Sequence, residues 1–375
     1  MTLPLIRRAF FAIVSAAALV SCSSGGGKAK PAELPVVTPR LHATQAWKLP
    51  VGATTSALMP AVVGDLVAVA SASGQLLMVR VGDGSVQSRV DVGAKLQAGV
   101  GFDGHMAAVV TERNELVAAV GNQVVWRNKL AASAYTTPLV AGQRVFVMTS
   151  DRTVQAFDGN TGIRLWQQTR TGEALVLRQP GVLTAFGDTL LAGIGGRLVA
   201  FNPSSGSIRW EVAAANPRGG NDVERLVDLV HPVSRIGNQV CVRAFQAAVA
   251  CVDALRGALS WRQNSDGQAG VSGDDSLLFG TDAAGRIQAW KRTNGEVVWT
   301  QDALKFRGVT APLWLGQSVV VGDAQGTLHF VSRQDGSLMA RIPSDGSPLV
   351  GAPVLSGDTL IAQTRAGNLF AWRPQ

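Results

Sequence analysis

The chain has 375 residues, 46% of them hydrophobic and 16% charged, with a formal net charge of +8. This apolar content can fill a large core, which excludes a disordered chain or a small domain held together by disulfides. The cationic residues are scattered singly rather than gathered on one face or helix, which argues against nucleic-acid binding. Glycine is enriched and Trp outnumbers Tyr nine to one, a bias typical of repeated sequence.

The first 21 residues have the features of a signal peptide. Two arginines precede an uncharged run, Ala9–Val20, that is too short to span a bilayer. The run ends in Leu19-Val20-Ser21-Cys22, which resembles the bacterial lipobox, where the cysteine thiol receives a diacylglyceryl group. The alternative is an ordinary secretory signal with an incidental cysteine. We predict a lipoprotein signal peptide over residues 1–21 and lipid attachment at Cys22.

The next segment, residues 22–42, is rich in Gly, Pro and Lys and has no hydrophobic periodicity. It is predicted to be a flexible linker that tethers a domain spanning residues 43–375 to the membrane. Ser23 stands where an aspartate would resemble an inner-membrane retention signal, so the resemblance favours sorting to the outer membrane.

The domain repeats a five-residue tag, Gly-x-x-x-Trp, at a nearly fixed period. Four copies are complete, and degenerate copies extend the series in both directions. The eight anchor positions are Trp47, Ser88, Trp126, Trp166, Trp210, Trp261, Trp299 and Ala340. Their spacing divides the domain into eight units of about 40 residues, a period typical of propeller blades.

A second marker keeps step with the tag. Pairs such as Gly64-Asp65, Gly142-Gln143 and Gly357-Asp358 precede short apolar runs and are typical of hairpin turns. Each unit therefore contains about four strands. A two-sheet sandwich also has many short strands, but it does not repeat a tag at a fixed period. We predict an all-β fold, an eight-bladed β-propeller with four-stranded antiparallel blades.

The ends of the domain indicate how the ring closes. The last unit, residues 353–375, ends before its fourth strand and its tag, whereas Trp47 belongs to no preceding unit. The segment Thr44–Pro50 is therefore expected to pair with the C-terminal blade, which removes two exposed sheet edges. The recurring tryptophans are interpreted as packing between neighbouring blades rather than as a binding platform.

Two further cysteines, Cys241 and Cys251, lie in the apolar run Val240–Val252, whose midpoint Gln246 fits a hairpin turn. They could face each other on adjacent strands. The sequence leaves a disulfide undecided, because its geometry is demanding and the register is not readable to one residue. The four histidines are far apart and no Cys-x-x-Cys occurs, so we predict no metal site.

The repeat resembles that of the quinoprotein β-propellers, most fully at Thr153–Asp158 and Arg197–Asn202. Some proteins with this repeat are pyrroloquinoline-quinone dehydrogenases, and others bind no quinone. The resemblance implies that a dehydrogenase would have adjacent cysteines stacked on the quinone and Glu, Asn and Asp ligands to Ca²⁺. Cys241 and Cys251 are ten residues apart, so a periplasmic quinoprotein-like dehydrogenase is only an alternative. No catalytic motif is present, and we predict no enzyme activity, no metal and no cofactor.

A lipoprotein whose mature part is one such propeller is similar to the outer membrane assembly factor B family. The segments Ala134–Leu139, Asn221–Asp228 and Gly322–Phe330 resemble family landmarks. The resemblance implies a non-catalytic scaffold subunit of the outer-membrane β-barrel assembly complex, lipid-anchored at the periplasmic face of the outer membrane. Its expected partners are the barrel insertase, the other subunits of the complex and, by strand addition, unfolded outer-membrane proteins. An interaction propeller with a different partner is the other alternative.

The resemblance also implies which residues bind the insertase. One loop of the family carries a Leu-x-Leu-Arg pattern, and the other follows a Glu-Arg-Leu segment with acidic residues. The first pattern falls within Gly172–Pro180, and the extra length of the longest repeat interval falls at Asn216–Val230, as expected of a binding insertion. Val230 departs from the acidic residue common there. The alternative is that the two leucines alternate into a core as a strand. The predicted partner-binding residues are Leu175, Leu177, Arg178, Glu224, Arg225 and Asp228.

Overall fold

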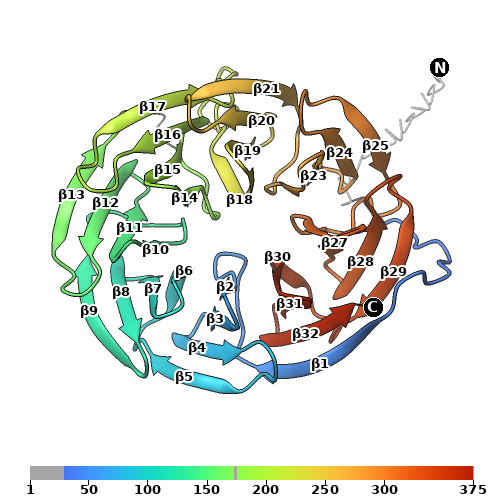
Figure 1. The fold of residues 1–375 in the computed structure, drawn as a ribbon, viewed down its shortest axis with the longest axis horizontal. Helices are drawn as coiled ribbons and strands as arrows, with labels where there is room; N and C mark the ends of the chain where they lie inside the picture. Colours follow the sequence, from blue (N-terminus) through green and yellow to red (C-terminus); the bar gives the residue numbers. More distant parts are fainter. Residues whose placement is uncertain (1–28, 173–174, 375) are drawn as a thin grey trace, which may run out of the picture. The chain divides into compact units, whose positions relative to one another are not determined.

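A computed structural model of the protein describes residues 29–172 and 175–374 (Figure 1). The predicted signal peptide, residues 1–21, and the predicted lipid attachment site, Cys22, lie outside the described residues. All named elements in the described ranges are β-strands. These ranges contain no helix that is long and apolar enough to cross a membrane. The strands form eight four-stranded sheets, which we number as blades 1–8.

The strands of the first four blades follow one another in chain order. Blade 1 contains β2 (Ala61–Val63), β3 (Leu66–Ala70), β4 (Gln75–Arg80) and β5 (Val86–Asp91), and blade 2 contains β6 (Leu96–Phe102), β7 (Met106–Thr111), β8 (Glu115–Val120) and β9 (Gln123–Lys129). Blade 3 contains β10 (Leu139–Ala141), β11 (Arg144–Met148), β12 (Thr153–Asp158) and β13 (Arg164–Thr169), and blade 4 contains β14 (Leu183–Phe186), β15 (Thr189–Ile194), β16 (Arg197–Phe201) and β17 (Ile208–Ala213).

The second half of the ring repeats this order until its last blade. Blade 5 contains β18 (Leu229–Ile236), β19 (Gln239–Ala244), β20 (Ala248–Asp253) and β21 (Ala258–Asn264), and blade 6 contains β22 (Ser272–Gly273), β23 (Leu277–Thr281), β24 (Ile287–Lys291) and β25 (Val297–Gln301). Blade 7 contains β26 (Leu313–Leu315), β27 (Ser318–Gly322), β28 (Thr327–Ser332) and β29 (Leu338–Pro343), and blade 8 contains β30 (Leu349–Ser356), β31 (Thr359–Thr364), β32 (Asn368–Pro374) and β1 (Ala43–Pro50).

The ring closes as the sequence predicts. The N-terminal strand β1 pairs antiparallel with β32, with Trp47 opposite Ala371, and it forms the outer strand of blade 8 (Figure 1). This pairing covers the free edge of β32, so that blade 8 has the same four strands as the other blades and β1 takes the outer position. The predicted eight-bladed propeller with four-stranded antiparallel blades is confirmed.

The blades present two different faces. Turns between the first and second strands and between the third and fourth strands lie at one end of each blade, as the bond from Gly159 N to Gln143 O illustrates (2.8 Å). We call this end the turn face. The other end, the loop face, carries the turns between second and third strands and the loops that lead to the next blade. There the N–H of Arg170 donates to the carbonyl of Arg152 (3.2 Å).

The recurring tag closes the seams between blades. Its tryptophan lies on the outer strand of one blade and covers the tag glycine of the next, so that a Cβ at Gly162 would come within 2.8 Å of the Trp126 ring. Positive φ at Gly162 (72°) also favours glycine there. Five indole N–H groups donate to a backbone carbonyl of the next blade: Trp47 to Val81 (2.7 Å), Trp126 to Gly159 (2.6 Å), Trp166 to Pro203 (2.9 Å), Trp261 to Arg292 (2.7 Å) and Trp299 to Arg333 (2.9 Å).

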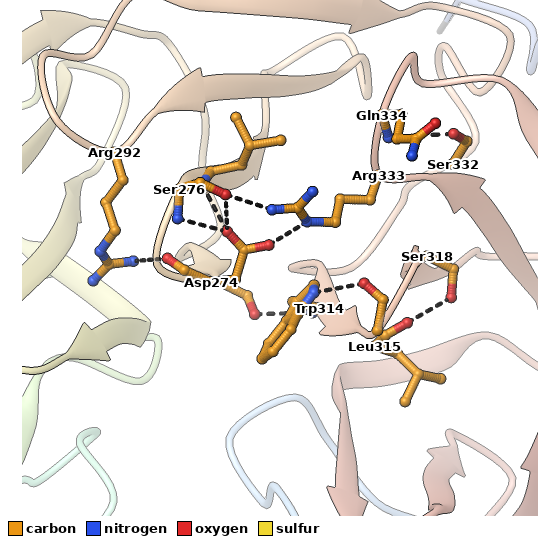
Figure 2. Close-up of polar contacts among 12 residues, drawn as sticks. Asp274, Ser276, Arg292, Trp314, Leu315, Ser318, Ser332, Arg333 and Gln334 are labelled. Atoms are coloured by element: carbon orange, nitrogen blue, oxygen red, sulfur yellow. Dashed lines mark hydrogen bonds and ion pairs between the residues drawn. The ribbon is translucent and has the colours of Figure 1, made fainter.

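The apolar core is spread through the ring rather than gathered in one place. Each cluster of buried side chains joins two neighbouring blades, as where Leu191 of β15 and Val240 of β19 belong to one cluster. Arginines add polar links between later blades. Arg333 of blade 7 reaches back to the carboxylate of Asp274 and the hydroxyl of Ser276 in blade 6 (Figure 2). Each blade is therefore stabilised mainly by contacts with its two neighbours.

The structure bears on two further points, the possible disulfide and the predicted linker. Cys241 on β19 lies directly opposite Cys251 on β20, with Cα atoms 4.0 Å apart, and the structure joins their sulfurs in a disulfide. The hairpin between them turns through Gln246, whose φ is 50°.

The second point concerns the predicted linker. From Pro31 onward the chain groups with the propeller. The N–H of Ala32 donates to Lys305 O (2.9 Å), and the N–H of Arg40 donates to Met339 O (2.9 Å). The buried Arg307 also donates to the carbonyl of Ala32 (3.1 Å). The last part of the predicted linker therefore lies along blades 6 and 7.

Candidate functional site

The first predicted binding segment lies in loop A, residues 170–182, which leads from blade 3 to blade 4 on the loop face. Its described residues form no strand, so the interpretation of Leu175 and Leu177 as core residues of a strand is wrong. The side chain of Leu175 is 40% exposed, Leu177 is half-buried and Arg178 is exposed. Loop A thus presents apolar surface beside a guanidinium group, which is a composition typical of interface hot spots.

Loop B, residues 214–228, leads from blade 4 to blade 5 and supports loop A. Its last residue, Asp228, accepts a hydrogen bond from the backbone N–H of Leu177 at Oδ2 (2.9 Å). Just beyond, the N–H of His231 donates to the carbonyl of Pro180 (3.0 Å), and Gly181 forms a bridge with Val230. Asp228 therefore fixes the backbone of loop A from the neighbouring blade.

A buried arginine that the sequence analysis missed connects both loops. Arg152, in the turn between β11 and β12, is 7% exposed. Its Nη2 donates to the carbonyl of Leu175 (3.1 Å), and its Nη1 lies 3.5 Å from Oδ1 of Asp228. Removing this guanidinium would leave the Asp228 carboxylate without its charge partner and the Leu175 carbonyl without its donor.

A signal for Arg152 is present in the repeat. Its φ is 62°, in the left-handed region, at the turn position where blades 1, 6, 7 and 8 have Gly74, Gly285, Gly326 and Gly367. A non-glycine residue held in this conformation is unusual and marks a position whose side chain is needed. Asn114 of blade 2 also replaces glycine at this position (φ 56°), but asparagine tolerates the left-handed region, so Arg152 is the more unusual residue.

Arg178 is placed by a different contact. Its guanidinium lies 5.3 Å from the ring centre of Tyr135, in the loop between β9 and β10, in cation–π geometry. Tyr135, Leu177 and Asp228 line a small pocket of about 50 Å³ between the loops. Blades 2 to 5 thus contribute to one continuous surface.

Two predicted residues, Glu224 and Arg225, lie apart from this group. They belong to an exposed turn of loop B, where Oε2 of Glu224 accepts a hydrogen bond from Gly220 N (2.7 Å). Glu224 lines a separate pocket of about 370 Å³ together with Arg262 of β21. Val230, where the family resemblance leads one to expect an acidic residue, is buried at the start of β18 and offers no polar contact. The structure therefore brings together Leu175, Leu177, Arg178 and Asp228.

The central channel has little of what a quinone enzyme needs. A pocket of about 230 Å³ lies there, lined by residues that include Gln179, His231 and Gln268. The two cysteines are paired across a hairpin of blade 5, ten residues apart, and do not line it. In residues 29–172 and 175–374, no group of three His, Cys, Asp or Glu side chains is placed to hold a metal ion.

Comparison with known proteins identifies relatives of this chain. A family model described as outer membrane protein assembly factor BamB matches residues 80–301. The chain is 34% identical over 379 residues to outer membrane protein assembly factor BamB of Burkholderia pseudomallei (strain K96243), covering 99% of this chain and 100% of that protein. It is 33% identical to BamB of Bordetella pertussis, over 95% of this chain and 94% of that protein.

Solved structures give the same fold. BamB from Moraxella catarrhalis superposes with a TM-score of 0.80 at 24% identity, over 88% of this chain and 100% of that one. Quinohemoprotein alcohol dehydrogenase from Comamonas testosteroni superposes with a TM-score of 0.67 at 12% identity, over 88% of this chain and 76% of that one. At these identities both comparisons establish the propeller alone, because one fold carries many functions.

Proposed function

This chain belongs to the outer membrane protein assembly factor BamB family, and from that premise we propose that it is a non-catalytic scaffold subunit of the machinery that assembles outer-membrane β-barrels. Its membership supports an accessory role in outer-membrane protein assembly. The more specific proposal is that the loop face docks on the periplasmic domains of the barrel insertase.

The observation that carries the proposal is the construction of loop A. Its Leu175 side chain is exposed, while its backbone is held by Arg152 and Asp228. Such preorganisation reduces the conformational entropy that binding would otherwise cost. The surface therefore offers Leu175, Leu177 and Arg178 to a partner in one fixed arrangement, with Asp228 as the residue that positions them. Glu224 and Arg225 would contact a partner only at the edge of this surface.

The family places the chain at the outer membrane. We propose that a diacylglyceryl group on Cys22 anchors it there after removal of residues 1–21, with the propeller on the periplasmic side. Anchoring would confine the propeller near its partners and so raise their effective concentration without new contacts. The exposed outer strands of the blades could also hold unfolded outer-membrane proteins by strand addition.

The alternative of a quinoprotein-like dehydrogenase is not favoured. The relatives at 33–34% identity are assembly factors, and the dehydrogenase likeness is limited to the fold. The other alternative is an interaction propeller with a different partner. A purification experiment distinguishes it from the proposed scaffold role.

The test is affinity purification of the full-length lipidated protein from detergent-solubilised membranes, followed by identification of bound proteins. Wild type is expected to recover an outer-membrane barrel insertase, and Leu175→Glu/Arg178→Glu is expected to lose it. A matched control, Ile163→Glu/Arg164→Glu, changes one aliphatic residue and one arginine at exposed positions of blade 3 at the turn face and is expected to behave as wild type.

Two other outcomes would change the conclusion. Equal recovery by both double variants would place the docking surface elsewhere on the propeller. If wild type recovers no barrel insertase under mild conditions, the proposed scaffold role is wrong and only the fold assignment stands.

A further inference from the structure

One of the six tag tryptophans does not close its seam. Trp210, on the outer strand of blade 4, is half-buried, and its indole N–H has no hydrogen-bond partner among the described residues. The carbonyl equivalent to those used at other seams belongs to Ala254, whose N–H bonds to Asn238 O (2.8 Å) just as Arg292 N bonds to Ser276 O (2.8 Å). The acceptor is therefore in place, and the indole does not use it.

The tag glycine is covered at this seam as at the others. A Cβ at Gly257 would come within 2.8 Å of Cγ and Cδ2 of Trp210, as a Cβ at Gly162 would with the same atoms of Trp126. The difference lies in the indole N–H, which Trp126 donates to Gly159 O and which Trp210 leaves unbonded beside an opening between blades 4 and 5.

A pocket of about 860 Å³ occupies this opening on the turn face. It lies between the β14–β15 turn of blade 4 and the β18–β19 and β20–β21 turns of blade 5, with Trp210 in its wall. It exceeds the pocket of about 230 Å³ in the central channel. Concave sites between structural units, with apolar walls and a few polar groups, are typical binding sites.

The polar groups in this pocket are mainly cationic. Three guanidinium groups and one carboxylate line it. Arg209 pairs with Asp188 through two bonds (2.8 and 3.0 Å), and Arg235 donates to the Ala185 carbonyl (2.6 Å). The side chain of Arg256 is 83% exposed and lies 3.7 Å from Asp253, which does not line the pocket. The wall therefore carries an excess of positive charge.

The apolar part of the wall adds a second requirement. Trp210 and Phe186 lie beside Ile236 and the largely exposed Leu255. Guanidinium groups form strong, directional hydrogen bonds with carboxylates. A tryptophan ring packs on apolar side chains, and its N–H acts only as a hydrogen-bond donor. A ligand that satisfies both parts has a carboxylate next to an aromatic or aliphatic side chain.

We propose that the seam between blades 4 and 5 is a second binding site, which takes an extended acidic peptide segment with carboxylate and apolar side chains in alternation. The arginines bind the carboxylates, and Trp210 packs on the apolar side chains and donates its N–H. The site lies on the turn face, opposite loops A and B, so its occupation does not depend on the proposed insertase contact. The propeller could then hold two partners at once.

The test uses the mature propeller-containing chain and a fluorescein-labelled peptide, Asp-Phe-Glu-Leu-Asp-Phe, with binding followed by fluorescence anisotropy. The Arg235→Glu/Arg256→Glu variant is expected to weaken binding by at least about tenfold, because it reverses two of the three cationic charges. The matched control Arg89→Glu/Arg164→Glu alters two exposed arginines outside the pocket and is expected to bind as wild type. A peptide with Asn and Gln in place of Asp and Glu is expected to bind at least about tenfold more weakly.

A second pair of variants tests the role of the indole. Trp210→Phe keeps an aromatic ring but removes the free N–H, and it is expected to weaken binding about threefold to tenfold. Trp166→Phe makes the same change at a closed seam and is expected to leave the peptide affinity unchanged. Thermal unfolding of each variant confirms that it is folded before binding is compared.

The proposal is overturned if wild type gives no saturable binding of the acidic peptide up to about 1 mM, or if the arginine reversal and its control bind equally well. Binding to phosphatidylglycerol vesicles without binding to the peptide would also overturn it, because the pocket would then serve a lipid surface. The same purification is made with Arg235→Glu/Arg256→Glu. If this variant still recovers the insertase, the scaffold role stands whether or not the peptide site is confirmed.

Discussion

The seam between blades 4 and 5 differs from the seam between blades 5 and 6, although the same tag builds both. At the second seam Trp261 is 8% exposed and bonded to Arg292 O, and the buried Arg292 side chain reaches back to Ser234 Oγ (2.8 Å). At the first seam Trp210 is half-buried, and Ala254 stands where Arg292 would be. The tag thus fixes where a tryptophan lies, but a complete tag does not by itself bring the indole N–H to its acceptor.

The largest expected effect comes from removing the two tryptophans. Trp261→Ala should lower the free energy of unfolding by about 3–5 kcal/mol, because it removes a buried ring and leaves a cavity. Trp210→Ala should cost only about 1–2 kcal/mol, because its ring already borders an open pocket and its N–H makes no bond to lose. Urea unfolding of both variants measures the difference. Equal losses would show that the two seams contribute alike and would remove the basis of the comparison.

The arginine at the closed seam gives a smaller but still clear effect. Arg292→Met should destabilise the protein by about 2–3 kcal/mol, since it removes donors to Ser234 and to the carbonyls of Gln239 and Asp274 in a buried setting. Its matched variant is Arg235→Met at the open seam, where the side chain is exposed and donates to one carbonyl. That change should cost about 0.5 kcal/mol or less. The contrast fails if the order of the two losses in urea unfolding is reversed.

A third arginine, Arg152, links loops as Arg292 links blades. Arg152→Met should weaken recovery of the insertase by about tenfold, because loop A would lose a donor to the Leu175 carbonyl and Asp228 would lose its charge partner. Quantitative immunoblotting of co-purified insertase against wild type measures it, and limited proteolysis should show faster cleavage within loop A. Arg144→Met, which removes a half-buried guanidinium on β11 that contacts Gly142 O and Ser204 Oγ, is the control. Unchanged recovery with Arg152→Met would mean that the surface does not need this support.

Much of this architecture could be predicted from the sequence, and the residues explain why. The tag and the Gly-Asp turns repeat at fixed spacing, so they identified the blade number, the hairpins and the closure through Trp47. The unused indole N–H of Trp210 was not predictable, because its tag is complete and the carbonyl of Ala254 is in the position that accepts at other seams. Arg152 was missed for a related reason: its importance lies in bonds to loops 23 and 76 residues later, and only its departure from the repeat's glycine signals it.

The smallest expected effect separates buried from exposed ion pairs at the seams. Burial alone would raise the pKa of Asp274. Hydrogen bonds from Arg333, Leu277 and Ser276 outweigh this effect and lower the pKa to about 2 (Figure 2). The unfolded chain has a carboxyl pKa of about 3.9. Asp274 therefore stabilises the fold above about pH 4, and this contribution is lost as pH falls from about 4 towards 2. Arg333→Met should raise the folded pKa and flatten the loss of stability in that range, as urea unfolding at several pH values would measure.

The exposed counterpart is the Asp188–Arg209 pair, which lies within blade 4 in the wall of the open seam. The hydrogen bond from Arg209 lowers the pKa of Asp188 as well, but the Asp188 side chain is 84% exposed, against 6% for Asp274. Water and salt screen an exposed pair, so Arg209→Met should change the acid dependence much less than Arg333→Met. In high salt the small effect of Arg209→Met should vanish while that of Arg333→Met persists. If both respond to salt in the same way, the Asp274 carboxylate between blades 6 and 7 is no better shielded than the Asp188 carboxylate beside the open seam, and the difference in burial between the two pairs has no electrostatic consequence.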